Sequence, residues 1–160
     1  HCMLVSSGLA AVTLVDIALL AGGDHVLLPD NVYGPNKNFT RNELAGWGVT
    51  LGLYDALDSA SLAAAIASAT KLVWLEAPGS VTLEFPDLRT LVRTVRAWAP
   101  QAVVALDNTW GAGLAFDAFS LGEGQGVDLT IHALTKYPSG GGDVLMGSVT
   151  TSPVSAASGR

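Results

Sequence analysis

Two stretches, Ala105-Leu106-Asp107-Asn108-Thr109-Trp110 and Ile131-His132-Ala133-Leu134-Thr135-Lys136-Tyr137, indicate how this chain folds. Each is an apolar run that ends in a polar, reactive side chain, which is typical of a buried strand where it reaches the edge of a sheet. Asp107 and Lys136 are 29 residues apart, about the length of one strand–crossover–strand unit. We therefore expect both to stand on the same edge of a parallel sheet, where a carboxylate and an amine share one crevice.

The rest of the chain alternates between apolar strands and helices. The expected strands are 2–5, 25–29, 49–54, 71–76, 103–106, 129–132 and 144–150. The expected helices are 8–20 (closed by Gly22-Gly23), 36–47, 58–67 and 86–98, with a short helical turn over 116–121. Because the strands are apolar on both faces, the pattern predicts an α/β fold with a mainly parallel sheet and helices on both faces.

Polar or reactive residues directly follow five of these strands: Ser7-Gly8, Tyr33, Glu76 to Ser80, Asp107 and Thr135-Lys136. In open α/β sheets, ligands bind outside the carboxyl ends of the strands. All five groups are therefore expected on one edge, as a single site. The turn at Ser6-Ser7-Gly8 also leaves free backbone N–H groups at a helix start, which is an anion site in many proteins.

Length and composition favour one domain whose partners are small molecules or protein. The 160 residues are 49% hydrophobic and 14% charged, which is ample for one core. A net charge of -6 with eight Lys and Arg argues against a nucleic-acid surface. The most apolar segment, 8–20, is too short to cross a bilayer, and no basic segment precedes it as in a signal peptide. The single Cys2 forms no internal disulfide, which fits a cytoplasmic location.

Metal and anion sites elsewhere in the chain are not expected. The three histidines have no metal-ligand spacing with Cys2 or any carboxylate, so we predict no metal. Arg89, Arg93 and Arg96 share one face of the helix expected over 86–98. A solvated helix surface is favoured over an anion site there.

Five blocks of sequence occur in a familiar order: Ser7-Gly8-Leu9-Ala10-Ala11, Tyr33-Gly34-Pro35, the stretch 75–84 (LEAPGSVTLE), Asp107 to Gly113, and Thr135-Lys136-Tyr137 with Gly140 and Asp143. Together they resemble the pyridoxal-phosphate (PLP) enzymes of cysteine and methionine metabolism, and within them the bacterial cystathionine β-lyases. The resemblance implies the aspartate-aminotransferase-like large domain of fold type I. It further implies a cytoplasmic carbon–sulfur lyase of transsulfuration and methionine biosynthesis, a homotetramer built as a dimer of dimers. Its reaction is β-elimination of cystathionine to homocysteine, pyruvate and ammonia.

The resemblance also implies which residues bind the cofactor: Gly8, Leu9, Tyr33, Asp107, Thr135 and Lys136. Lys136 would hold the cofactor as a Schiff base and act as the general base, with Tyr33 stacked on the pyridine ring as the second catalytic residue. Asp107 would keep the pyridine nitrogen protonated, which makes the ring an electron sink. Without Lys136, the simplest interpretation of Asp107 is a helix N-cap.

Substrate-binding residues are implied at Ser80 and Trp110, and here the sequence departs from many family members. The Gly79-Ser80 form and a tryptophan at Trp110 favour the β-lyase group. Ala133 stands where the family has a serine for the phosphate, and Gly140 to Gly142 replace a more polar turn. The loop 122–126 is longer than the family pattern and is expected to have no role.

The chain begins at His1 within an apolar run, and we expect it to be part of a longer protein. In that interpretation 1–150 is a partial PLP-binding large domain, 151–160 is a truncated tail, and an N-terminal arm and a C-terminal domain lie outside it. Two alternatives remain open. One is another PLP reaction of the same family, as a γ-lyase, γ-synthase or sulfhydrylase, and the other is a catalytically inert α/β fragment.

Overall fold

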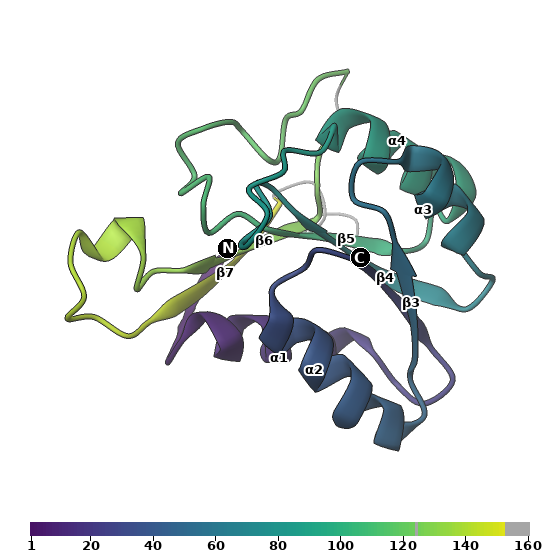
Figure 1. The fold of residues 1–160 in the computed structure, drawn as a ribbon, viewed down its shortest axis with the longest axis horizontal. Helices are drawn as coiled ribbons and strands as arrows, with labels where there is room; N and C mark the ends of the chain where they lie inside the picture. Colours follow the sequence, from purple (N-terminus) through teal and green to yellow (C-terminus); the bar gives the residue numbers. More distant parts are fainter. Residues whose placement is uncertain (124, 153–160) are drawn as a thin grey trace.

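The computed structural model describes residues 1–123 and 125–152, and it shows one twisted sheet covered by helices on both faces (Figure 1). The strands are β1 (Cys2–Val5), β2 (His25–Pro29), β3 (Thr50–Tyr54), β4 (Thr70–Glu76), β5 (Val103–Asp107), β6 (Leu129–Ala133) and β7 (Gly147–Thr151). The helices are α1 (Gly8–Leu19), α2 (Gly34–Asn42), α3 (Ser59–Ala65) and α4 (Leu88–Trp98), with short 3-10 helices η1 (Leu44–Trp47) and η2 (Tyr137–Ser139). The predicted α/β class is confirmed.

The sheet has the strand order β1-β7-β6-β5-β4-β2-β3. The five consecutive strands β6, β5, β4, β2 and β3 are parallel to one another, whereas β7 is antiparallel to both of its neighbours, β6 and β1. Because β7 is antiparallel to both β6 and β1, strand β1 runs in the same direction as β6. The carboxyl end of β1, where α1 begins, therefore lies on the same edge of the sheet as the carboxyl ends of the parallel strands.

Two apolar layers hold the helices to the sheet. Helices α1 and α2 lie on one face and α3 and α4 on the other (Figure 1). Helix α4 buries Leu91 and Val95 in the layer of its face, and α1 buries Val12 and Val15 in the layer of the opposite face. Each fully buried Val or Leu side chain contributes about 1.5–3 kcal/mol of transfer free energy. No helix in the described part of the chain is long and apolar enough to span a bilayer.

Side-chain caps fix the start of three helices. Ser7 Oγ accepts a hydrogen bond from Ala10 N at 3.0 Å at the start of α1. Asp58 and Asp87 cap α3 and α4 in the same manner. The helices expected over 58–67 and 86–98 therefore begin directly after Asp58 and Asp87, because a short polar side chain there satisfies an amide that has no partner within the helix.

Three helix predictions were wrong in detail. The helix expected over 36–47 is divided into α2 and η1, since Pro35 starts α2 early and Gly48, with φ +86°, stops the chain after Trp47. Helix α1 ends at Leu20 with extended backbone, before the predicted Gly22-Gly23 cap. The stretch 116–121 forms only a turn closed by Ser120 N and Asp117 O, because the Asp117 side chain binds Phe119 N.

The last strand is shifted relative to its prediction. It begins at Gly147 rather than Val144 and extends to Thr151. Thr151, placed in the predicted tail, therefore belongs to β7. Ser152 follows β7 and is buried, and residues 153–160 of that tail lie outside the described residues.

Candidate functional site

A crevice of about 480 Å³ opens at the carboxyl edge of the sheet. The structure brings every site residue expected from the sequence to its walls: Gly8, Leu9, Tyr33, Ser80, Asp107, Trp110, Thr135 and Lys136. The expectation that an acid and an amine share one crevice is confirmed by Asp107 and Lys136. Ser7 and Glu76, which the strand-end pattern also placed at this edge, line the crevice as well. Thr109 lines it too, although no role in the site was expected for it from the sequence.

The start of α1 forms one end of the crevice. A Cβ atom on Gly8 would lie 2.5 Å from Ala133 Cβ, so glycine allows α1 to approach the end of β6 closely. The first amides of a helix have no partner within it and carry partial positive charge, which favours an anion. Thr135 stands nearby, and its hydroxyl accepts from Met146 N at 3.2 Å. This end of the crevice suits a phosphate group.

The opposite wall carries aromatic rings and the lysine. The Lys136 Nζ atom lies 5.8 Å from the centre of the Trp110 ring, within the range of a cation–π contact. Trp110 in turn meets Tyr137 edge to face, with ring centres 5.8 Å apart. Lys136 is exposed at the mouth of the crevice. Tyr33, from the turn before α2, is 37% exposed and presents a flat face to the same space.

Two carboxylates stand side by side on the floor of the crevice. Glu76 ends β4, and its Cα is paired in register with that of Asp107 at the end of β5. Asp107 accepts from Thr109 N at 3.0 Å, and burial raises the pKa of Asp107 despite the hydrogen bonds from Thr109. Burial, and next the charge of Asp107, raise the pKa of Glu76 to about 7. Glu76 carried a sequence signal, since it is a carboxylate at a strand end within the block 75–84.

Glu76 also organises the loop that holds Ser80. Its two oxygens accept from Tyr33 N at 2.7 Å and from Ser80 N at 2.6 Å. The Ser80 Oγ atom is buried, and no described residue bonds to it. A buried hydroxyl at the wall of a crevice is available to a ligand, because an unsatisfied polar group costs free energy when it stays unpaired.

Thr109 joins the ends of β5 and β6. Its hydroxyl oxygen accepts from Ala133 N at 2.9 Å, and its amide donates to Asp107. Thr109 is only 6% exposed. It therefore fixes the spacing between the carboxylate of Asp107 and the strand that leads to Lys136.

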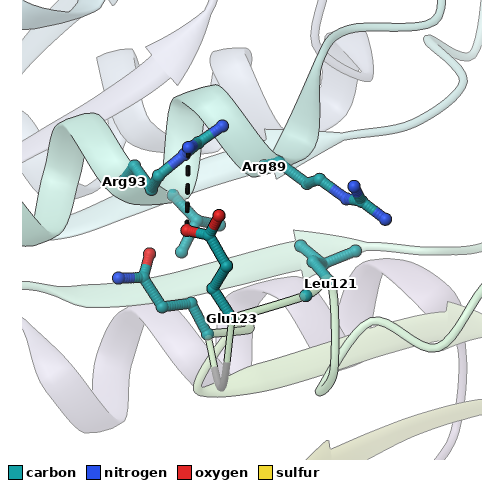
Figure 2. Close-up of a pocket in the computed structure, with 7 residues that line it drawn as sticks. Arg89, Arg93, Leu121 and Glu123 are labelled. Atoms are coloured by element: carbon teal, nitrogen blue, oxygen red, sulfur yellow. Dashed lines mark ion pairs between the residues drawn. The ribbon is translucent and has the colours of Figure 1, made fainter.

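A second hollow, of about 50 Å³, lies between α4 and the segment after Leu121. Figure 2 shows Arg93 directed at Glu123, with Nη1 and Oε2 3.7 Å apart, and Arg89 directed away from this pair. Both partners of the ion pair are more than half exposed, as expected for a solvated helix face. Exposed ion pairs of this kind contribute little to the free energy of folding. For Arg96 that prediction was wrong: it bonds Asp128 Oδ2 at 2.9 Å and is largely buried.

Comparisons of the sequence and of the fold with known proteins all lead to enzymes of cysteine and methionine metabolism. A family model described as Cys/Met metabolism PLP-dependent enzyme matches residues 1–158. The cystathionine β-lyase of Escherichia coli K12 is 38% identical over 146 residues, which are 91% of this chain and 36% of that enzyme. The cystathionine β-lyase of Salmonella typhimurium is 39% identical over 146 residues, with the same coverage of 91% and 36%.

A solved structure shows the same arrangement of the chain. The cystathionine γ-lyase from Lactobacillus plantarum, complexed with L-serine, superposes with a TM-score of 0.88 at 27% identity. The match covers 98% of this chain and 39% of that one. The chain therefore spans little more than a third of the length of these relatives.

Proposed function

Because this chain belongs to the Cys/Met metabolism PLP-dependent enzymes, we propose that its crevice binds the cofactor of a PLP-dependent carbon–sulfur lyase. One observation carries the proposal: an amine, a carboxylate, a flat aromatic side chain and a helix start line a single space, contributed by Lys136, Asp107, Tyr33 and α1. Its volume of about 480 Å³ lies within the usual range for small-molecule sites of about 300–1,000 Å³.

The residues present fit pyridoxal phosphate at each of its polar groups. The amides of Gly8 and Leu9 and the hydroxyl of Thr135 suit the phosphate, and the Asp107 carboxylate suits a protonated ring nitrogen. The unpaired hydroxyl of Ser80 is free to bond the ring oxygen or the substrate. When bound, the cofactor supplies an aldehyde and an electron sink.

The chain's own residues then carry out binding and proton transfer. Asp107 holds the ring nitrogen, Tyr33 covers one ring face, and Lys136 removes the Cα proton of the amino acid as general base. Trp110 places its ring beside Lys136 and narrows the space left for the substrate. Once the Cα proton is lost from a substrate with sulfur on Cβ, a Cα–Cβ double bond would form as the Cβ–S bond breaks, and the sulfur would take up a proton and leave as the thiol. Water would then hydrolyse the C–N bond of the remainder to a keto acid and ammonia.

Among lyases of this family, we infer the cystathionine β-lyase type. The support is the identity to the Escherichia coli and Salmonella typhimurium enzymes, with the Gly79-Ser80 form and Trp110. A γ-lyase is the alternative, favoured by the match to the Lactobacillus plantarum structure. The keto acid formed from cystathionine separates them, since β-elimination yields pyruvate and γ-elimination yields the keto acid that is one carbon longer. That longer product would overturn the β-lyase assignment.

We further propose that 1–150 is part of a large, PLP-binding domain, and that the whole protein acts in the cytoplasm as a dimer of dimers. The low share of each relative that the chain covers supports an additional arm and a further domain. Sedimentation of the whole protein with and without the cofactor measures its assembly. A monomer of the whole protein would contradict this assignment.

The test of cofactor binding is a covalent label on Lys136. The purified chain, and the Escherichia coli relative with its matching segment exchanged for this chain, are incubated with pyridoxal phosphate, treated with borohydride and mapped by mass spectrometry. We expect the label on Lys136, its loss in Lys136→Ala, and its retention in the control Lys71→Ala. A label spread over the lysines, or none in either protein, would contradict the proposal.

A further inference from the structure

Glu76 joins two walls of the crevice through one buried carboxylate. It is 2% exposed. One of its oxygens accepts a hydrogen bond from the backbone amide of Tyr33, on the loop after β2, and the other accepts one from the backbone amide of Ser80, on the loop after β4. Helix α2 has no side-chain cap of its own at Tyr33. The position of the Tyr33 ring therefore depends on Glu76, as does the position of the Ser80 hydroxyl.

The charge on Glu76 is coupled to the ligand that pairs with Asp107. Both carboxylates lie at paired positions of β4 and β5, and two adjacent buried negative charges repel. A cation placed against Asp107 offsets that repulsion. It thereby favours the ionised form of Glu76, whose hydrogen bonds to the two amides are stronger than those of the neutral acid.

Besides Asp107, the titratable groups near Glu76 are Tyr33 and Lys136, which line the same crevice, and Tyr54, which interacts with the charges of both Glu76 and Asp30. Burial, and next the charges of Asp30 and Glu76, raise the pKa of Tyr54, so that its hydroxyl stays protonated and donates to Trp74 O at 2.7 Å. After burial, Asp107 is the group that raises the pKa of Glu76, to about 7.

We propose that Glu76 is a positioning residue, a role that rests on the proposed function. Its carboxylate holds Tyr33 and Ser80 against the bound pyridine ring, and it releases its proton to solvent when the protonated ring nitrogen pairs with Asp107. Cofactor binding, the strengthening of both hydrogen bonds to Glu76 and the loss of one proton are then a single event. The affinity for the cofactor rises with pH through neutrality for this reason.

The test compares Glu76→Gln with a matched control, Glu84→Gln. Glu84 joins the same two loops on the surface, where its Oε2 accepts from Asn31 Nδ2 at 2.8 Å, but it does not line the crevice. A glutamine at 76 offers one acceptor oxygen, so its NH2 group faces one of the two amides and leaves that donor unpaired. The readouts are the Kd for pyridoxal phosphate by tryptophan fluorescence at pH 6 and pH 8, and the protons released on binding, counted by calorimetry in two buffers.

For Glu76→Gln we expect a Kd at pH 8 that is about tenfold higher, with fewer protons released than in the parent. Glu84→Gln should stay within about twofold of the parent in Kd, with the same proton count. If Glu76→Gln does not fold, Glu76→Asp serves instead: its shorter side chain should weaken binding while the proton release remains. A Kd and a proton count equal to those of the parent in the folded variant would overturn the role of Glu76.

The two proposals fail in different ways. A parent protein that takes the borohydride-fixed label on Lys136, alongside an unaffected Glu76 variant, overturns the role of Glu76 alone. A parent that takes no such label overturns the proposed function, and the role of Glu76 with it.

Discussion

Asp16, on the inner side of α1, is a buried carboxylate far from the crevice chemistry. It is fully buried, its Oδ1 accepts from Trp74 Nε1 at 2.8 Å, and no described residue bonds its Oδ2. Burial raises the pKa of Asp16 to about 7, against a smaller lowering by the Trp74 hydrogen bond. The folded chain thus keeps a proton that the unfolded chain releases near pH 4. The stability that this proton gives is full below about pH 4 and is lost as pH rises to about 7.

Asp16→Asn should therefore flatten the pH dependence of stability. The amide oxygen can still accept from Trp74, and no ionisation remains. We expect the fall in the free energy of unfolding between pH 5 and pH 8 to shrink by about 1 kcal/mol or more, measured by urea denaturation at both pH values. The raised pKa of Glu76 also lowers stability as pH rises over this range. Because Glu76 is present in both proteins, its contribution cancels in the comparison. An unchanged difference between the two pH values would contradict this interpretation.

At the scale of single residues, the sequence was sufficient to predict the position of a side chain where that side chain follows the end of a strand. It placed Asp107 and Lys136 in one crevice, because strand ends can be recognised from the apolar runs before them. It did not distinguish Arg96 from Arg89 and Arg93, since all three fall at helical spacing. Only the tertiary structure brings Asp128 against Arg96. Glu76 was visible as a motif residue, but its two amide partners come from loops that the sequence does not place.

Among the elements, α1 and α3 offer a matched pair of N-caps for a test. Ser7 caps α1 at the crevice, and Asp58 caps α3 on the other face of the sheet, where its Oδ1 accepts from Ala60 N at 2.8 Å. Removing either cap should cost about 1 kcal/mol of stability. Only Ser7→Ala should also weaken binding of pyridoxal phosphate, by about threefold or more, because it loosens the helix start beside the phosphate.

Thermal unfolding and cofactor titration of Ser7→Ala and Asp58→Ala measure these two effects separately. Equal cofactor affinities in both variants, at equal loss of stability, would show that the start of α1 does not contact the phosphate. A weaker affinity in Asp58→Ala would show that the cap acts only through overall stability.

Element types were predictable and element ends less so. All seven predicted strands form, and the central ones, such as β4 and β5, are largely buried, as their apolar runs predicted. Strand β7 starts three residues later than expected. The helix expected over 36–47 broke into α2 and η1 because backbone chemistry at Pro35 and Gly48 outweighed the hydrophobic pattern. The antiparallel direction of β7 could not be predicted from the amino-acid composition of the strand either. It follows from the turn after Lys136, which returns the chain along β6.

Over the whole molecule, β1 and β3 are the two edge strands of the sheet in the part of the chain that the structure describes, and the β1 edge carries exposed apolar side chains. Strand β1 pairs there with β7 alone, and its Met3 and Leu4 are 58% and 62% exposed. Ile17 on α1 is 51% exposed. Unpaired strand edges with exposed apolar side chains promote association between chains.

We accordingly expect the purified 160-residue chain to self-associate. Gel filtration over a range of concentrations should show species larger than a monomer, and Leu4→Lys should shift the profile towards the monomer. Leu57→Lys is the control, since Leu57 is 57% exposed and follows β3, at the opposite end of the sheet from β1. A concentration-independent monomer for the parent would contradict the prediction.

The pairing of β1 with β7 also sets an order of assembly. Cys2 is the register partner of Thr150, and Val5 is the partner of Gly147, so the first strand of the sheet meets its neighbour only after nearly all of the described chain has been made. Strands β2 to β6 can associate earlier on the ribosome, while the segment that starts α1 waits for the last strand. The end of the crevice that we propose to bind the phosphate is consequently the last part to form. A nascent chain stopped before β7 would already hold Asp107 and Lys136, yet it would lack a fixed place for the phosphate.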